Sequence, residues 1–570
     1  MLILATCAAM SVPAAGQLSG SPPCGGERVY VHLDKQVYVT GEPINFKVYL
    51  INGAVPGTDP CSKILYFTLL DAGEKSGAEW RINIDDGPVS GSFLIPAEIE
   101  AGLYQLRVFT NLMRNGPSDC VYSQNVLIVS LSEAIPDTLI LPFQGDTLAG
   151  HLPAFTQNGY TLKVTTSKDT YEANETVHME IALSSLQQTD VTADLSVSVT
   201  AETPFRELIP ETKMTSCLKA GIPRQDKKQV PCKYQAENKS FILTGRIRNR
   251  KDNTPLAHGK ILLSVTDSIS PKIIYASTDK AGEFHFYLGR IFDNQELILQ
   301  FGDQSRNTDY YWEADKKTWI AGQWIVKPYG LNPEETAFLS VLKDLRLIEA
   351  VYAGKSTPEP AETVTSRPNY FNFPNQVVYP GDFADLVNFK EIADNILPGV
   401  KFAVHSHDFS LQLLNGKSGL WQENNTVLLN GVPYTDLAYI ATLGTREIKR
   451  IEVMAENYLA GSITFPGLIS IYTYDNAIPE NYLKNNTFIF RNTVIPNDRE
   501  TASRLKALTG EHDPDFRGTL FWDPRISITG KENRVIEFPA SLLTGRYSIK
   551  IRGLTDHDIP LSTDAFFEVK

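Results

Sequence analysis

The stretch V-Y-V-H-L-D-K-Q-V-Y-V-T-G-E-P-I-N-F-K-V-Y-L, residues 29–50, decides how the rest of the chain is interpreted. In its second half apolar side chains occupy every second position, which is typical of one face of a half-buried strand. Its first half alternates in the same way around a Lys-Gln centre. Gly41 stands between the two runs, where a turn needs a residue without a β-carbon. The pattern predicts two strands joined by a turn, with the alternating residues Tyr30, His32, Val37, Val39, Ile44, Phe46, Val48 and Leu50.

The same stretch resembles the opening of a macroglobulin-like β-sandwich, the module that repeats in α2-macroglobulins and complement-type proteins. The matching positions are Asp34, Lys35, Tyr38, Gly41, Glu42, Phe46 and Val48, while Gln36 stands where the family usually has Pro. Two further family motifs follow in order, G-S-F-L-I-P at 91–96 and G-L-Y-Q-L-R-V-F at 102–109. The resemblance implies a first sandwich over residues 24–132, and a module of this type is a scaffold rather than a catalyst.

Length and composition favour several β-rich domains. The chain has 570 residues, too many for one hydrophobic core, and the usual domain size suggests about four domains. Tyr (24) and Phe (27) are abundant, and Gly (38) and Pro (34) supply turns, so many short strands are expected. The net charge of −13 argues against a nucleic-acid partner and against electrostatic docking on anionic lipid.

The first sixteen residues have the features of a cleaved export signal. Residues 2–10 are apolar apart from Thr6, and Ala14-Ala15-Gly16 resembles a small-residue cleavage site. A lipid anchor at Cys7 is the alternative, although Thr before the cysteine is atypical. No later segment has the ~18 consecutive apolar residues that a membrane helix needs. We therefore expect residues 1–16 to be a signal peptide and the mature chain to be exported, with no transmembrane segment of its own.

An internal repeat of the opening motif begins near residue 159. The run S-K-D-T-Y-E-A-N-E-T-V-H-M, residues 167–179, matches the first module at a constant offset of 133 residues. Asn174 replaces Gly41, and Asn is the next-best residue for a left-handed turn. The matching pairs are Lys35 and Lys168, Tyr38 and Tyr171, Glu42 and Glu175, and Phe46 and Met179. We therefore expect a diverged second macroglobulin-like module over residues 159–235.

A third β-module is expected over residues 240–330, followed by a helix and linker over 332–367. F-I-L-T-G-R-I-R-N at 241–249 and S-T-D-K-A-G-E-F-H-F-Y-L at 277–288 resemble the carboxypeptidase regulatory-like β-sandwich, which is a structural domain despite its name. Apolar residues have helical spacing between Pro333 and Tyr352, and 356–367 is rich in Pro, Thr and Glu. The positions that match the regulatory-like family are Gly245, Pro255, Leu256, Asp279, Gly282, Phe284 and Phe286.

Residues 368–478 resemble the plug domain of TonB-dependent outer-membrane transporters. N-T-V-L-L-N-G-V-P-Y at 425–434 is followed by I-K-R-I-E-V-M at 448–454 and L-I-S-I-Y-T at 468–473, with Asn430 where the family usually has Asp. We expect no transporter barrel after it, because 570 − 475 = 95 residues follow and a barrel of about 22 strands needs more than about 200. The stretch 479–570, with G-R-Y-S-I-K-I-R-G at 545–553, is expected to form a C-terminal β-sandwich.

Together these assignments predict a mainly β fold. It consists of tandem β-sandwich modules of macroglobulin-like or immunoglobulin-like type and one small mixed α/β plug-like domain. The order of the modules resembles barrel-less, multi-domain exported proteins of Bacteroidota. That resemblance implies a location in the periplasm or at the outer membrane.

The sequence holds no complete catalytic or cofactor-binding motif. The macroglobulin thioester motif G-C-G-E-Q has no counterpart, because the nearest stretch, Cys24-Gly25-Gly26-Glu27, has its Glu displaced and lacks the Gln. His405 and His407 are two residues apart, but no further ligand cluster indicates a metal site. We therefore expect no enzyme activity, no metal and no cofactor.

Five cysteines follow the expected signal peptide, and none forms a C-x-x-C pair. Export permits disulfides. Cys217 and Cys232 flank a polar segment, and Cys61 and Cys120 lie within the first module, so these two pairings are expected. Cys24 is left over.

The modules indicate an exported, non-enzymatic scaffold or binding protein that acts through protein–protein contacts. The plug-like domain is the candidate for the contact, with an exposed turn at Asn430-Gly431 and with Pro433 and Tyr434 beside it as partner-binding residues. Use of this domain as a rigid spacer is the alternative. Two other functions stay open: an accessory plug-like component of an outer-membrane transport complex, which would bind a separately encoded barrel, and a macroglobulin-type protease trap.

Overall fold

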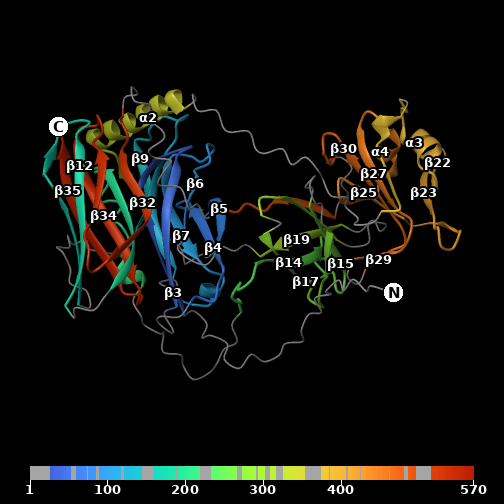
Figure 1. The fold of residues 1–570 in the computed structure, drawn as a ribbon, viewed down its shortest axis with the longest axis horizontal. Coiled ribbons are helices and arrows are strands. Elements are labelled where there is room, and N and C mark those ends of the chain that lie inside the picture. Colours follow the sequence, from blue (N-terminus) through green and yellow to red (C-terminus); the bar gives the residue numbers. More distant parts are fainter. Residues whose placement is uncertain are drawn as a thin grey trace, which may run out of the picture. The chain divides into compact units, whose positions relative to one another are not determined.

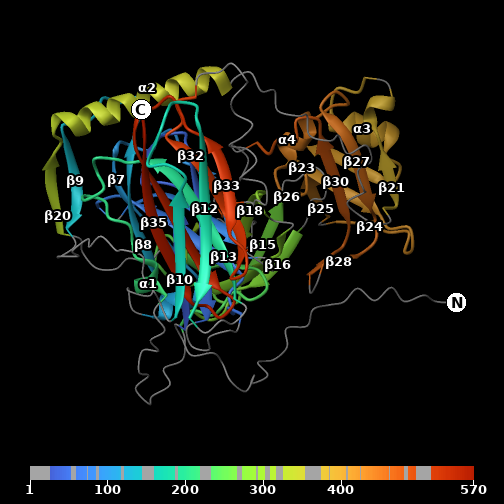
Figure 2. The same cartoon turned by 60° about the vertical axis from the view of Figure 1, so that its left-hand side comes forward.

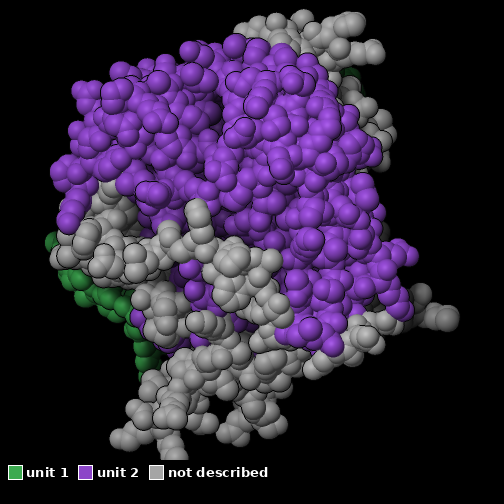
Figure 3. Space-filling view, turned by 90° about the vertical axis from the view of Figure 1, so that its left-hand side faces the viewer, with its two compact units in different colours: residues 1–18, 241–316, 360–493 green, residues 19–240, 317–359, 494–570 purple. Residues whose placement is uncertain are grey.

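The fold is mainly β, as the sequence predicts, and it is seen in a computed structural model. The chain divides into two compact units: unit 1 comprises residues 1–18, 241–316 and 360–493, and unit 2 comprises 19–240, 317–359 and 494–570 (Figure 3). The structure describes residues 26–52, 59–73, 75–84, 89–116, 121–143, 159–186, 191–218, 233–265, 273–290, 293–301, 309–315, 325–353, 374–383, 385–405, 408–423, 425–460, 463–479, 486–495 and 515–570. The expected signal peptide and Cys7 lie outside them. Among the described residues, no helix combines the length and the apolar character needed to cross a membrane.

The first sandwich of unit 2 is built from the first eight strands. Its three-stranded sheet has the order β1 (Glu27–Leu33), β3 (Pro43–Asn52) and β6 (Val89–Leu94). Its five-stranded sheet has the order β2 (Val37–Val39), β8 (Tyr122–Val129), β7 (Gly102–Phe109), β4 (Ile64–Leu70) and β5 (Ser76–Asn83). Phe46, Phe67 and Phe93 pack against one another between the sheets, so the alternating apolar residues of β3 face the core as expected.

The second sandwich of unit 2 is assembled from two segments that lie far apart in the sequence. Its three-stranded sheet has the order β10 (Tyr160–Thr166), β12 (Thr176–Ser185) and β33 (Arg534–Pro539). Its five-stranded sheet has the order β11 (Thr170–Tyr171), β35 (Pro560–Val569), β34 (Gly545–Thr555), β13 (Thr192–Ala201) and β32 (Thr519–Thr529). The separate modules expected at 159–235 and 479–570 are therefore one sandwich, because neither segment holds enough strands to bury its own apolar face.

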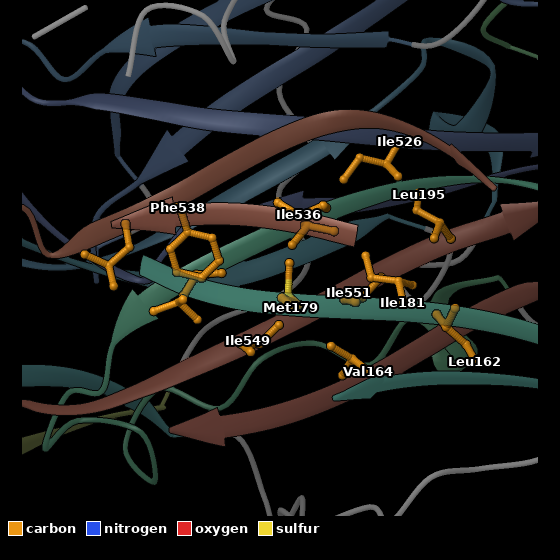
Figure 4. Close-up of a cluster of buried hydrophobic side chains, with 14 of the residues drawn as sticks. Leu162, Val164, Met179, Ile181, Leu195, Ile526, Ile536, Phe538, Ile549 and Ile551 are labelled. Atoms are coloured by element: carbon orange, nitrogen blue, oxygen red, sulfur yellow. The ribbon is translucent and has the colours of Figure 1, made fainter. Parts of the chain in front are cut away.

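The core of this sandwich contains side chains from both segments. Met179 and Ile181 from β12 lie among Ile536 and Phe538 from β33 and Ile551 from β34 (Figure 4). Strands from the two segments are neighbours in both sheets: β12 lies beside β33, and β13 lies between β34 and β32 (Figure 1 and Figure 2).

The two sandwiches share one topology, strand for strand. The sheet orders β1-β3-β6 and β2-β8-β7-β4-β5 become β10-β12-β33 and β11-β35-β34-β13-β32 when each strand is replaced by its counterpart. Even the parallel pair recurs, because β2 pairs with β8 and β11 with β35 in parallel register. The second copy differs by a long insertion, residues 202–517, between its fourth and fifth strands, where the first copy has a short connection.

The repeated motif has the same geometry in both copies. The Lys35 ammonium pairs with the Glu42 carboxylate, and Lys168 pairs with Glu175 in the same way. Glu42 also accepts the Val39 amide, which closes the turn in which Gly41 has a φ of 79°. Asn174 occupies the equivalent position with a φ of 63°. The predicted repeat is therefore a structural repeat, and Asn174 takes over the left-handed turn of Gly41.

The third sandwich belongs to unit 1 and also draws on a distant strand. One sheet has the order β17 (Glu283–Leu288), β14 (Phe241–Asn249) and β19 (Tyr310–Ala314). The other has the order β16 (Ile273–Ser277), β15 (Lys260–Val265), β18 (Glu296–Phe301) and β31 (Thr487–Arg491). Phe488 of β31 stacks on Phe301 at a centroid distance of 5.2 Å. Part of the stretch expected in the C-terminal sandwich thus completes the regulatory-like one.

The plug-like domain of unit 1 is a mixed α/β fold, as expected. Its main sheet has the order β21 (Gln376–Val378), β27 (Ile448–Met454), β30 (Leu468–Thr473), β25 (Thr426–Leu429) and β26 (Val432–Tyr434), with β25 and β30 parallel. The helices are α3 (Phe389–Ile396) and α4 (Leu437–Thr442). A second sheet holds β22 (Val400–His405), β23 (Asp408–Leu414) and β24 (Trp421–Gln422), and β28 (Tyr458–Ala460) pairs with β29 (Ile463–Phe465).

Helix α2 (Pro333–Ala353) lies where the sequence predicts a helix, and it belongs to unit 2. Leu339 is buried on the first sandwich with Val37, Leu127 and Val129. The Arg346 guanidinium donates to the Gly41 carbonyl at 2.9 Å, so the helix covers one end of that sandwich. Just before it, β20 (Ile325–Gly330) pairs with β9 (Thr138–Phe143), and α1 (Met214–Cys217) follows β13.

Joining β13 directly to β32 tests the two-segment sandwich. The amide of Ala201 donates to the Gly518 carbonyl at 2.8 Å, so a short Gly-rich turn can replace residues 202–517. We expect residues 157–201 joined by such a turn to 518–570 to unfold cooperatively on heating, because the whole core is present. Residues 479–570 alone should show no cooperative transition in calorimetry. A cooperative transition of the 479–570 fragment would contradict the shared core.

Candidate functional site

Two groups of residues are candidates for function: the predicted plug-like turn in unit 1, and a set of buried charged side chains in unit 2. The turn belongs to the motif that resembles a transporter plug. Most residues of the buried set stand at strand positions where the sequence shows no feature other than ordinary polar side chains.

The turn at Asn430-Gly431 joins β25 to β26. Asn430 has a φ of 50° and Gly431 a φ of 87°, as a two-residue hairpin turn of this type requires. Asn430 is nevertheless buried, in contrast to the exposed turn that we expected. Its side-chain amide donates to the Thr473 hydroxyl at 2.9 Å and to the Ala477 carbonyl at 2.8 Å, and its side-chain oxygen accepts the Thr473 amide at 2.9 Å. Asn430 therefore fastens the hairpin to the end of β30.

The neighbouring predicted residues also take part in packing within unit 1. The Pro433 carbonyl accepts a hydrogen bond from the Gln300 side chain of the regulatory-like sandwich at 2.9 Å. Leu428 and Leu468 pack with Phe465 and with Ile273 of that sandwich. Tyr434 is buried, with its ring beside Tyr439. The turn is wrong as an exposed contact site because these contacts within unit 1 bury it.

The remaining sequence-based candidates are placed only in part. Cys61 and Cys217 are free thiols. Their expected partners, Cys120 and Cys232, lie outside the described residues, so both pairings stay predictions. Burial raises the pKa of the Cys217 thiol to about 12. His405 is the backbone register partner of Asp408 in the β22–β23 pair, while His407 is outside the described part of the chain.

A set of charged and polar side chains, most of them buried, lies between the two sandwiches of unit 2, and we call it the polar seam. The outward faces of β1 and β3 on the first sandwich meet β13 and β34 of the second. Their counterparts on β12, His178 and Glu180, are exposed. The first sandwich contributes Tyr30, His32, Lys47 and Tyr49 to the seam. The second contributes Asp194, Ser196, Ser198, Lys550 and Arg552, and the start of the insertion contributes Glu211.

Glu211 is the centre of the seam. Arg552 approaches its carboxylate with two nitrogens, Nε and Nη2, each at 3.0 Å, and Lys550 reaches it at 3.0 Å. Tyr30 donates its hydroxyl at 2.8 Å. Burial alone would raise the pKa of Glu211, but Arg552 and Lys550 hold that pKa well below its usual range. The carboxylate is therefore ionised, and its charge is matched by the two cations.

His32 is held neutral beside this pair. Burial, and then the positive charge of Arg552, lower the pKa of His32 well below its usual range. Its two ring nitrogens face hydroxyls, Ser196 at 2.6 Å and Ser198 at 3.3 Å, and its ring lies 5.2 Å from that of Trp522. A neutral imidazole with one donor and one acceptor nitrogen satisfies both hydroxyls without adding a charge.

Lys47 forms the second ion pair of the seam. Its side chain is 1% exposed, and its ammonium lies 2.7 Å from the Asp194 carboxylate. Ser196 contacts the Tyr49 hydroxyl at 2.8 Å, and that hydroxyl donates to the Arg552 carbonyl at 2.8 Å. Among the described residues, no group of His, Cys, Asp and Glu side chains is arranged to hold a metal ion. The seam is thus a hydrogen-bonded contact that fixes one sandwich on the other.

Replacing Glu211 tests the importance of the seam. Glu211→Gln removes the negative charge and leaves Arg552 with Asp564 as its remaining carboxylate, at 2.6 Å. We expect the free energy of unfolding of unit 2 to fall by about 3 kcal/mol, because a buried cation loses its main partner. Glu537→Gln is the matched control: its carboxylate pairs with His178 in the open, and its loss should cost less than about 1 kcal/mol. Equal effects in urea denaturation would show that the seam contributes little.

Titration of His32 provides a second test. Its folded pKa lies below the unfolded value of about 6.5, so between the two values only the unfolded chain binds the proton. The stability that this histidine contributes is therefore complete above about pH 6.5 and falls as the pH drops below it, by up to about 1.4 kcal/mol per pH unit. His32→Asn should flatten the pH dependence between about pH 7 and 5. The readout is the urea midpoint of the transition that Glu211→Gln shifts, and identical slopes would refute the assignment.

Comparison with known proteins finds macroglobulins among the solved structures. No protein-family model matches the sequence, and no curated protein matches it. The crystal structure of Salmonella alpha-2-macroglobulin reacted with methylamine is 7% identical, and the match covers 96% of this chain and 24% of that one with a TM-score of 0.16. Trypsin-activated alpha-2-macroglobulin from Escherichia coli is 9% identical over 96% of this chain and 42% of its own, with a TM-score of 0.22. The chain thus spans less than half the length of these macroglobulins.

Proposed function

We propose that this chain is an exported, non-enzymatic scaffold or binding protein that acts through protein–protein contacts in the periplasm or at the outer membrane. The observation that carries the proposal is the pair of equivalent sandwiches in unit 2, joined by the polar seam around Glu211 and Arg552. Charges that are largely buried and paired with one another favour one arrangement of two packed surfaces. A fixed pair of modules that carries a second unit as an insertion has the organisation of a scaffold.

The plug-like domain supports a second candidate function, that of an accessory component of an outer-membrane transport complex. Its mixed sheet, with β25 and β30 parallel and the β25–β26 hairpin beside them, supports the resemblance to a transporter plug. In that case the partner would be a separately encoded outer-membrane barrel. The protease-trap function has no comparable observation among the described residues.

Affinity purification of the tagged full-length chain from detergent-solubilised outer membranes separates these functions. We expect the scaffold to retain a defined protein partner in stoichiometric amount. A barrel as that partner would favour the accessory function, and a covalent or trapped protease would favour the trap. Glu211→Gln shows whether retention depends on the fixed pair of sandwiches: reduced retention would mean that the partner also contacts unit 2. Recovery of no partner would argue against a scaffold.

The absence of catalysis is a prediction of the same proposal. The modules to which the sequence has resemblances are non-catalytic, so the purified chain should show no turnover of glycan or peptide libraries. Mass spectrometry of the incubated libraries is the measurement. Sustained turnover that disappears when one carboxylate pair is replaced would show that the chain is an enzyme.

A further inference from the structure

An exposed apolar patch lies on the plug-like domain, apart from the buried turn. It consists of Tyr379 (47% exposed), Phe383 (51%), Val387 (68%) and Tyr474 (61%). Tyr379 and Phe383 flank the short 3-10 turn η4 (Pro380–Asp382), and Tyr474 directly follows β30. Soluble proteins rarely leave several large apolar side chains together in water unless the surface contacts a partner.

Contacts within the domain hold the segments that carry these side chains next to one another. The Tyr474 hydroxyl lies 3.3 Å from the position that a β-carbon on Gly381 would take, so its ring lies beside the turn. The Tyr474 amide donates to the Glu447 carbonyl at 3.1 Å, and the Thr445 amide donates to the Leu386 carbonyl at 2.9 Å. Apart from residue 384, which lies outside the described part of the chain, the segments 379–387, 444–447 and 473–476 therefore lie side by side.

The turn itself is also fixed. The Asp382 amide donates to the Tyr379 carbonyl and the Phe383 amide to the Pro380 carbonyl, each at 3.1 Å. Downstream, the Asn388 side chain caps α3 by accepting the Glu391 amide at 2.9 Å. The exposed rings are therefore held in place before any partner binds, which lowers the entropic cost of binding.

The rim of the patch is acidic. In these three segments the carboxylates are Asp382, Asp385, Glu447 and Asp475, and the cation is Arg446. Arg446 is already paired, because its guanidinium contacts the Asp385 carboxylate at 2.5 Å. The pKa of Asp475 is held below its usual value by a hydrogen bond from the Thr473 hydroxyl, so this carboxylate stays ionised. Aromatic faces beside uncompensated carboxylates favour cations.

We propose that this exposed apolar patch is the docking surface for a basic, extended segment of a partner protein, one in which Arg or Lys side chains alternate with apolar ones. The apolar side chains of the segment would cover Phe383 and Val387. Its cations would lie over the rings of Tyr379 and Tyr474 and against Asp382 and Asp475. The proposal rests on the proposed binding function and names the surface and the partner chemistry that serve it.

The test measures binding of the full-length protein to an array of random decapeptides sorted by net charge. We expect the bound peptides to carry net positive charge and at least one large apolar residue. Tyr474→Ser and Phe383→Ser should each weaken binding by about tenfold or more, because each removes a ring from the surface. Asp382→Asn should weaken binding of the cationic peptides several-fold and reduce its sensitivity to salt.

Tyr287→Ser is the matched control. Tyr287 is 67% exposed, but it lies on β17 of the regulatory-like sandwich, so its replacement should leave peptide binding unchanged. All variants change exposed side chains, and an unaltered thermal transition checks that they fold. Binding that ignores peptide charge, binding that Tyr474→Ser leaves intact, or no binding at all would overturn the proposal. Self-association of the chain or flotation with phosphatidylcholine vesicles, either of them abolished by Phe383→Ser, would instead assign the patch to a second copy or to lipid.

A second purification distinguishes a wrong docking surface from a wrong binding function. The membrane purification is repeated with Tyr474→Ser and Phe383→Ser. A partner that is retained by these variants leaves the scaffold function in place and removes the patch as its docking surface. A partner that is absent even with the unchanged protein argues against the binding function itself.

Discussion

The structure of unit 2 depends on the pairing of β13 with β32 and β34. This pairing brings residues 192–201 together with 519–555 and so completes a sandwich across the long insertion. Because Ala201 and Gly518 are hydrogen-bonded neighbours, the insertion must leave and re-enter the sandwich at one point. The entropic cost of such a long connection grows only slowly with its length, by about 0.6 kcal/mol for each doubling. The sandwich therefore tolerates a compact insertion with adjacent ends, whereas an insertion with distant ends would separate β13 from β32.

The polar seam extends this constraint to the first sandwich. Glu211 lies in the first part of the insertion, shortly after β13, and its main partner Arg552 lies on β34. Tyr30 of the first sandwich donates to the same carboxylate. One buried charge thus links the start of the insertion and both sandwiches. The contact between the sandwiches also explains why the equivalent strands β3 and β12 differ in burial. Lys47 of β3 is buried because it faces the second sandwich, while His178 and Glu180 of β12 face water.

Local sequence features predicted the elements of this structure better than their assembly. The alternation around Gly41 and the repeat at Lys168, Tyr171 and Glu175 depend on neighbouring residues, and the structure places them as expected. The union of 159–201 with 519–569 depends on pairing between distant strands, for which one sequence holds no local signal. The clue was present in Tyr104 and Tyr547, which stand at the same place in equivalent strands and donate to the carbonyls of Glu100 and Leu543, four residues upstream. The seam was missed because Lys47 alternates with the apolar residues of its strand, and such positions usually face solvent. His32 belongs to the alternating set of its own strand, so its place in the repeat gave no sign of a polar contact.

The plug-like domain shows why motif residues and contact residues need not coincide. Asn430 belongs to the recognisable motif because its side chain joins the hairpin to Thr473, and Pro433 follows a turn whose backbone must adopt positive φ values. Residues such as Asn430 hold the fold together through their contacts, and those contacts bury them. Tyr379, Phe383 and Tyr474 have no comparable task, since their side chains leave about half or more of their surface in water. A folded domain does not gain stability from exposing large rings, and the proposed docking surface accounts for their exposure. The motif therefore marks the fold of this domain, while the exposed rings carry the proposed contact with a partner.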